Sequence, residues 1–128
     1  MNKDSRLVEA LVDLINEYVD IENTISSLPC GYVSTKTISG KTYYYRQWRD
    51  GKKISSVYIP NALVNGIKRK ITFRKENEVL LKEVKKDLSR TTRKVAKAGL
   101  FTEDDVVSLL QARRDGKDVS EEASKLVK

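Results

Sequence analysis

The sequence predicts an α+β fold, in which two long helices form an antiparallel, coiled-coil-like hairpin and a three-stranded antiparallel β-meander connects them. Two observations lead to this prediction. Apolar residues recur at helical spacing before residue 30 and again after residue 61, whereas residues 32–59 alternate with a period of two. A small helical hairpin is expected at the C-terminal end, and we therefore divide the chain into residues 1–98 and residues 99–128.

The first predicted helix carries a heptad pattern. Its apolar residues follow one another at alternating spacings of four and three, which is the seam of a coiled coil. Pro29 and Gly31 are expected to end this helix. The pattern leaves open whether the heptads close within the chain or between chains, but a thin seam buries little surface in one copy and favours a homodimer. The seam consists of Leu7, Leu11, Leu14, Tyr18, Ile21, Ile25 and Leu28.

Three runs rich in aromatic and β-branched residues follow, at 32–38, 41–48 and 53–59. Such runs are typical of strands. Ser39-Gly40 and Asp50-Gly51 separate them and favour tight turns, because glycine and aspartate tolerate a positive φ angle.

Alternation divides the side chains of the middle run between the two faces of the predicted sheet. Tyr43, Tyr45 and Gln47 lie on one face, and Tyr44, Arg46 and Trp48 lie on the other. Only one face can pack against helices, and a shift of one residue in register would exchange the two. The sequence therefore predicts an exposed aromatic and basic face without deciding which one it is.

A second long helix is predicted from Asn61 to Gly99, with a break or kink near residues 73–77 where the apolar stripe weakens. Between Lys68 and Lys97 there are twelve Lys/Arg and four Asp/Glu, an excess of one sign that a mixed solubilising surface does not show. Helical spacing aligns five of these cations along one side of the helix. They are Lys82, Lys86, Arg90, Arg93 and Lys97.

The last thirty residues carry their own helix signals. Thr102, followed by three acids, is typical of a capped helix start, and Asp115-Gly116 ends that helix. Ser120 is expected to open a final short helix.

The composition argues against an enzyme. The chain has no histidine and one cysteine, Cys30, which excludes an internal disulfide, Cys/His zinc sites and triads that need an imidazole. Ser39-Gly40-Lys41-Thr42 imitates the end of a P-loop, but Thr35 stands where that motif requires glycine. Glu103, Asp104 and Asp105 are explained by the helix start, and the tyrosines by the sheet. We therefore expect no catalytic residues, no metal and no cofactor.

Charge and hydropathy indicate the compartment and the partner. No apolar run reaches the roughly 20 residues of a membrane span, so we expect a cytoplasmic protein without membrane contact. Localised positive charge beside aromatic residues provides the phosphate neutralisation and stacking on which nucleic-acid binding depends. We therefore predict non-catalytic binding of nucleic acid, with double-stranded DNA as the expected target. The predicted contacts are Arg46, Trp48, Lys52 and Lys53 of the sheet and Lys82, Lys86, Arg90, Arg93 and Lys97 of the helix.

An acidic protein surface is the alternative partner. In that case the chain is a protein-interaction module, such as a phage-borne inhibitor that blocks a host defence nuclease complex.

The stretch around the predicted hairpin resembles a small, poorly characterised bacterial and phage domain. In that family a heptad helix meets a Leu-Pro-x-Gly break, followed by a Gly-Lys-x-Tyr-Tyr-Tyr hairpin and a helix rich in Lys and Glu. The resemblance extends over roughly residues 5–90 and implies no function, although its members accompany mobile-element and defence genes. The matching residues are Leu28, Pro29, Gly31, Gly40, Lys41, Tyr43, Tyr44, Tyr45, Trp48, Gly51, Lys52 and Tyr58.

The hairpin is also similar to the three-stranded arm-binding domain of tyrosine recombinases, which reads DNA with its sheet. This chain departs from that family by its long flanking helices and by having no catalytic domain. The shared pattern consists of Gly40, Lys41, Tyr43, Tyr45, Asp50, Gly51, Lys52 and Lys53.

Overall fold

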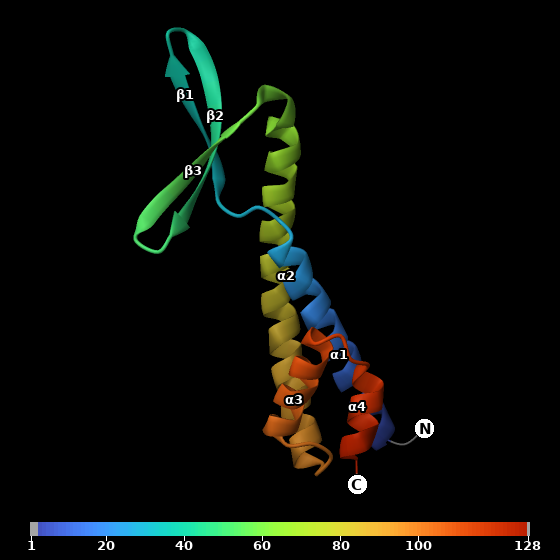
Figure 1. Cartoon of the computed structure of the whole chain (residues 1–128). Coiled ribbons are helices and arrows are strands. Elements are labelled where there is room, and N and C mark those ends of the chain that lie inside the picture. Colours follow the sequence, from blue (N-terminus) through green and yellow to red (C-terminus); the bar gives the residue numbers. More distant parts are fainter. Residues whose placement is uncertain (1–2, 128) are drawn as a thin grey trace. The chain divides into compact units, whose positions relative to one another are not determined.

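The computed structural model describes residues 3–127 and confirms the α+β class (Figure 1). A long helix leads into a three-stranded sheet, a second long helix follows, and two short helices form the predicted C-terminal hairpin. In chain order the elements are α1 (Lys3–Ser26), β1 (Tyr32–Ile38), β2 (Lys41–Asp50), β3 (Lys53–Ile59), a 3-10 turn (Asn61–Leu63), α2 (Val64–Lys97), α3 (Glu103–Arg114) and α4 (Val119–Leu126).

The chain divides into two compact units, each with many contacts between its own residues. The helical unit contains residues 3–23 and 79–127 of the described chain, and the sheet unit contains residues 24–78. Both long helices pass from one unit into the other. Within the helical unit, α3 and α4 pack with the start of α1 and the end of α2. The division into residues 1–98 and 99–128 stays a prediction.

The core of the helical unit is built by all four of its helical segments. Leu11 and Ile15 of α1 are completely buried, as is Val95 of α2. The heptad seam of α1 is thus covered by helices of the same chain, and the homodimer stays a prediction. The cluster of buried residues consists of Leu11, Val12, Ile15, Leu88, Val95, Phe101, Val106, Leu109, Val119 and Ala123.

Local signals fix the corner between α2 and α3. The Leu100 amide donates to Val95 O at 2.9 Å and the Gly99 amide to Ala96 O at 3.0 Å, which is a Schellman motif with Gly99 at a φ of +74°. The Thr102 hydroxyl then accepts from the Asp105 amide, and the Asp105 carboxylate accepts from the Thr102 amide. This capping box confirms the predicted start of α3.

The sheet is the predicted meander, with strand order β1-β2-β3 and antiparallel pairing throughout. Ser39 and Gly40 both have positive φ angles, as a two-residue type I′ turn requires. Strand β2 continues two residues beyond the predicted end, so Asp50 pairs with Lys53 and the second turn is Gly51-Lys52. The turn shifts because Gly51, with its φ of +65°, takes the first turn position.

Three residues hold the break between α1 and β1. Gly31 has a φ of +95°, and a Cβ atom there would lie 2.0 Å from Gln47 O of β2. Arg74 of α2 donates to both Ile25 O and Leu28 O at 2.7 Å, at and just beyond the end of α1, and Ile25 O also accepts from the Leu28 amide at 3.1 Å. Arg46 of β2 donates to Cys30 O at 2.9 Å. The break is therefore tied to both the sheet and the second helix within the sheet unit.

Of the break or kink expected near residues 73–77, the break is wrong, because α2 is a single helix from Val64 to Lys97. The polar residue Asn77 is only 9% exposed, and its side-chain amide donates to Phe73 O at 2.9 Å, one turn back along the helix. The weak apolar stripe of this segment thus reflects a buried amide that bonds within the helix, and the backbone continues through it.

Gly31→Ala should destabilise the chain by about 3 kcal/mol or more, because the new methyl group meets a backbone carbonyl and alanine disfavours a positive φ angle. Urea unfolding followed by Trp48 fluorescence measures the effect. Gly66→Ala in α2 is the matched control: no atom lies within 4 Å of its added Cβ, and it should stabilise by roughly 0.5–1 kcal/mol. Equal effects of the two changes would contradict the close approach at Gly31.

Candidate nucleic-acid interface

The five predicted helix cations lie together on the side of α2 that faces away from the core. At about 100° per residue they fall within an arc of about 80°. The buried residues Val84, Leu88 and Val95 lie on the opposite side of the same helix. We call these five the α2 basic face: Lys82, Lys86, Arg90, Arg93 and Lys97, all of them exposed.

Few carboxylates neutralise the α2 basic face. Lys86 pairs with Glu83 at 3.4 Å and Arg90 with Asp87 at 3.1 Å, both within the helix and both solvent-exposed. Exposed helix pairs of this kind contribute roughly 0.2–0.5 kcal/mol each and exchange readily with other anions. The other three cations have no ion pair with any residue between 3 and 127. The face is therefore available to an external anion.

The acids near the end of α1 pair with α3 instead. Asp20 pairs with Arg113, whose Nε also donates to Asn16 Oδ1 at 3.1 Å. Glu22 accepts two hydrogen bonds from Arg114, each 3.1 Å long, and this bonding raises the pKa of the Arg114 guanidinium. These α1 carboxylates therefore pair with arginines of α3 and do not neutralise the α2 basic face.

Within the helical unit, the α2 segment has a net positive charge and the other segments have a net negative charge. Its segment of α2, residues 79–97, has seven Lys/Arg and two Asp/Glu. Residues 3–23 have two Lys/Arg and six Asp/Glu, and residues 98–127 have four and seven. A polyanion is attracted to one side of this unit and repelled by the others.

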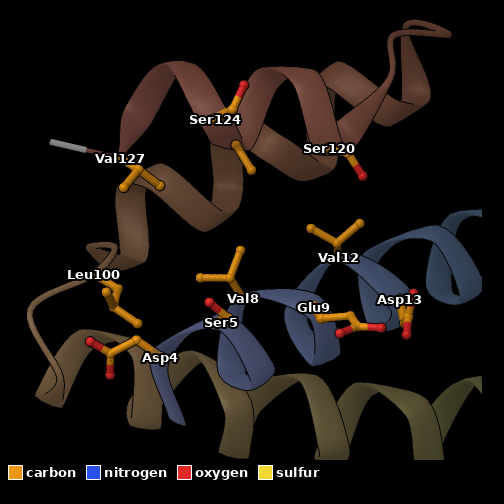
Figure 2. A pocket seen from close by; sticks show the side chains of 11 residues that line it. Asp4, Ser5, Val8, Glu9, Val12, Asp13, Leu100, Ser120, Ser124 and Val127 are labelled. Atoms are coloured by element: carbon orange, nitrogen blue, oxygen red, sulfur yellow. The ribbon is translucent and has the colours of Figure 1, made fainter. Parts of the chain in front are cut away.

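A hollow between α1 and α4 belongs to the acidic part (Figure 2). Its volume is about 950 Å³, and Val8 and Val12 extend into it from α1. Asp4, Glu9 and Asp13 line it as well. These carboxylates oppose nucleic acid, so this hollow is not part of the candidate interface.

The sheet unit carries most of the positive charge. Residues 24–78 contain eleven Lys/Arg and three Asp/Glu, which makes a net charge of +8. Two of these cations are tied into the fold: Arg46 and Arg74 hold the break after α1. The remaining nine are distributed over the sheet and the first part of α2.

The predicted sheet contacts differ in their surroundings. Arg46 bonds to Cys30 O, and its guanidinium carbon lies 3.9 Å from the centre of the Trp48 ring. Both side chains are half-buried and serve the fold, while Lys52 and Lys53 are exposed at the second turn. Two of the four predicted sheet contacts, Arg46 and Trp48, thus have a structural role, and binding by all four stays a prediction.

The pairing register shows which residues share a face of the sheet, and their contacts show which face is open. Tyr44 and Arg46 share a face with Ile59, which is buried, and Lys68 of α2 lies 5.9 Å from the Tyr44 ring. The opposite side carries four tyrosines, which we call the tyrosine face: Tyr32, Tyr43, Tyr45 and Tyr58.

The residue-by-residue prediction missed the tyrosine face. Alternation places Tyr43 and Tyr45 on one side, but only the tertiary contacts of Arg46, Tyr44 and Ile59 show that this side is the open one. The sequence signal that could have predicted this face is the alternation of Tyr43 and Tyr45 in the middle strand, together with the position of Tyr58 in the third strand.

Between residues 3 and 127 no helix is both long and apolar enough to cross a membrane. The same residues contain no group of three or more His, Cys, Asp or Glu side chains that could hold a metal ion.

A family model for a domain of unknown function, DUF6788, matches residues 5–69, which is half of the chain. The chain belongs to this family. The matched segment includes α1 from residue 5 onward, the whole sheet and the start of α2, and it ends before the α2 basic face. No protein of curated function and no solved structure matches the chain significantly.

Replacing all five residues of the α2 basic face with glutamine should change the free energy of unfolding by no more than about 1 kcal/mol. Glutamine keeps the helix propensity, and only two weak ion pairs are lost. Leu88→Ala on the opposite side of the helix should cost about 2–5 kcal/mol, because it leaves a cavity in the core. Urea unfolding of both variants tests this separation of surface and core, and a large loss in the glutamine variant would contradict it.

Proposed function

We propose that this chain is a non-catalytic nucleic-acid-binding protein with double-stranded DNA as its target. The observation that supports this most is the α2 basic face, whose five cations are exposed, aligned and on the side opposite the core. Phosphates along a duplex present a regular row of charges that such a row of cations can neutralise.

The sheet unit supports the same function through its net charge of +8. Phosphate contacts fix the position of a protein on DNA, and contacts to bases supply any sequence preference. We propose Lys52 and Lys53 as additional phosphate contacts, while Arg46 and Trp48 act mainly by holding the sheet in place. The likeness of the hairpin to recombinase arm-binding domains agrees with DNA as the target, and we propose an origin in a phage or mobile element.

Binding to a labelled duplex should weaken steeply with salt, and the triple variant K82Q/K86Q/R93Q should reduce the slope of log K against log salt by about 3. Each phosphate contact contributes a slope of roughly 0.9, because binding releases the counterions condensed on the DNA. Fluorescence anisotropy between low and moderate salt measures both slopes.

The matched control is R6Q/K117Q/K125Q, which removes the same formal charge from exposed positions outside α2. Its slope should stay close to that of the unaltered protein. Equal slopes for the two triple variants, or no duplex binding at low salt, would overturn the proposal. In the second case, capture of one acidic protein would support the inhibitor class instead.

A further inference from the structure

The tyrosine face of the sheet has the properties of a surface that stacks bases. Tyr32 is 49% exposed and Tyr58 is 50% exposed, and Tyr43 and Tyr45 are half-buried beside them. The Tyr58 ring lies 5.9 Å from that of Tyr45 at an angle of 69° and 6.4 Å from that of Tyr43 at 55°. The rings meet at tilted, edge-to-face angles, and because Tyr58 is half exposed, part of its ring surface stays open to a flat ligand.

The charge on this face selects an anionic ligand. Alternation places Lys36, Lys41 and Arg49 on the same side of the sheet as the tyrosines, and no described Asp or Glu lies on that side. The Lys36 ammonium is 4.9 Å from the centre of the Tyr45 ring, so cation and aromatic ring are presented together. The only carboxylate of the three strands, Asp50, is on the opposite face.

The spacing of the rings distinguishes unpaired bases from paired ones. The ring centres of Tyr45 and Tyr58, which pair across β2 and β3, are 5.9 Å apart, and the ring planes are inclined at 69°. Neighbouring bases of a duplex are only about 3.4 Å apart and cover each other's faces. Aromatic side chains therefore stack on bases that have left the duplex, as in other sheet surfaces that bind single strands.

We propose that the tyrosine face binds single-stranded nucleic acid by stacking its bases on Tyr45 and Tyr58, with Lys36, Lys41 and Arg49 contacting the phosphates. This inference extends the proposed nucleic-acid binding and rests on it in part, but it concerns a separate surface within the sheet unit. The two surfaces bind through different interactions. The α2 basic face offers only charge, whereas the tyrosine face offers charge and aromatic rings for stacking.

The test compares two double variants of the full chain. Y45V/Y58V removes both rings and keeps β-branched residues in the strands, whereas Y45F/Y58F keeps the rings and removes only the hydroxyls. The probes are a fluorescein-labelled twelve-nucleotide oligothymidylate and a labelled duplex of the same length. The valine pair should bind the single strand about tenfold or more weakly, with an unchanged salt slope, because each stacked base contributes substantially to affinity. The phenylalanine pair should bind within about twofold of the unaltered protein.

Trp48 provides a second readout, because it lies on the opposite face of the sheet, against Arg46. Saturation with oligothymidylate should leave its fluorescence nearly unchanged. Strong quenching would place the bases on the other face and overturn the inference, even if the valine pair folded poorly. The inference would also be wrong if the valine pair bound the single strand as tightly as the unaltered protein.

Failure of the two proposals can be told apart. Suppose that K82Q/K86Q/R93Q leaves duplex binding and its salt slope unchanged, while single-strand binding depends on Tyr45 and Tyr58. This result would overturn the proposed role of the α2 basic face and uphold that of the tyrosine face. A valine pair that loses duplex and single-strand binding to the same extent would overturn the tyrosine face as a site for unpaired bases.

Discussion

The burial of one side of α2 is the constraint on which the helical unit depends. Leu88 and Val95 bring this helix into contact with the core formed by α1, α3 and α4, and Val84 is buried on the same side of the helix. Because helical geometry fixes the angle between side chains, burying this stripe forces the cations from Lys82 to Lys97 to the opposite side. The exposed row of charge is thus a consequence of the hydrophobic core. The apolar contacts stabilise the fold, and the cations are left available for binding.

Arginines serve two different purposes in this chain. Arg74 and Arg46 bind main-chain carbonyls around the break after α1, and Arg113 and Arg114 bind acids of α1. A planar guanidinium with several donors suits such multiple bonds better than an ammonium group does. Lysines, by contrast, dominate the charge that stays exposed. A count of positive residues therefore overstates the charge that is available to a partner, and the contacts show which cations remain.

Local signals in the sequence predicted most of the elements correctly. The heptads of α1, the three alternating runs and the cap at Thr102 gave helices and strands close to those observed, because each depends on residues near one another in the chain. The break expected near Phe73 was wrong, since Asn77 satisfies its amide within the helix and the helix continues. The grouping of α3 and α4 with the ends of α1 and α2 depends on contacts between distant residues, which periodicity does not report.

The sequence by itself determined the α+β class, the strand order of a meander and the alignment of five cations on one side of a helix. These follow from residue spacing and from turn residues such as Gly40 and Gly51. Only the tertiary structure decided which side of the sheet is open. Alternation separates Tyr45 from Arg46, but the hydrogen bond of Arg46 to Cys30 O and the burial of Ile59 turn their face toward the rest of the sheet unit. The physical reason is that a strand has two equivalent sides until distant residues pack on one of them.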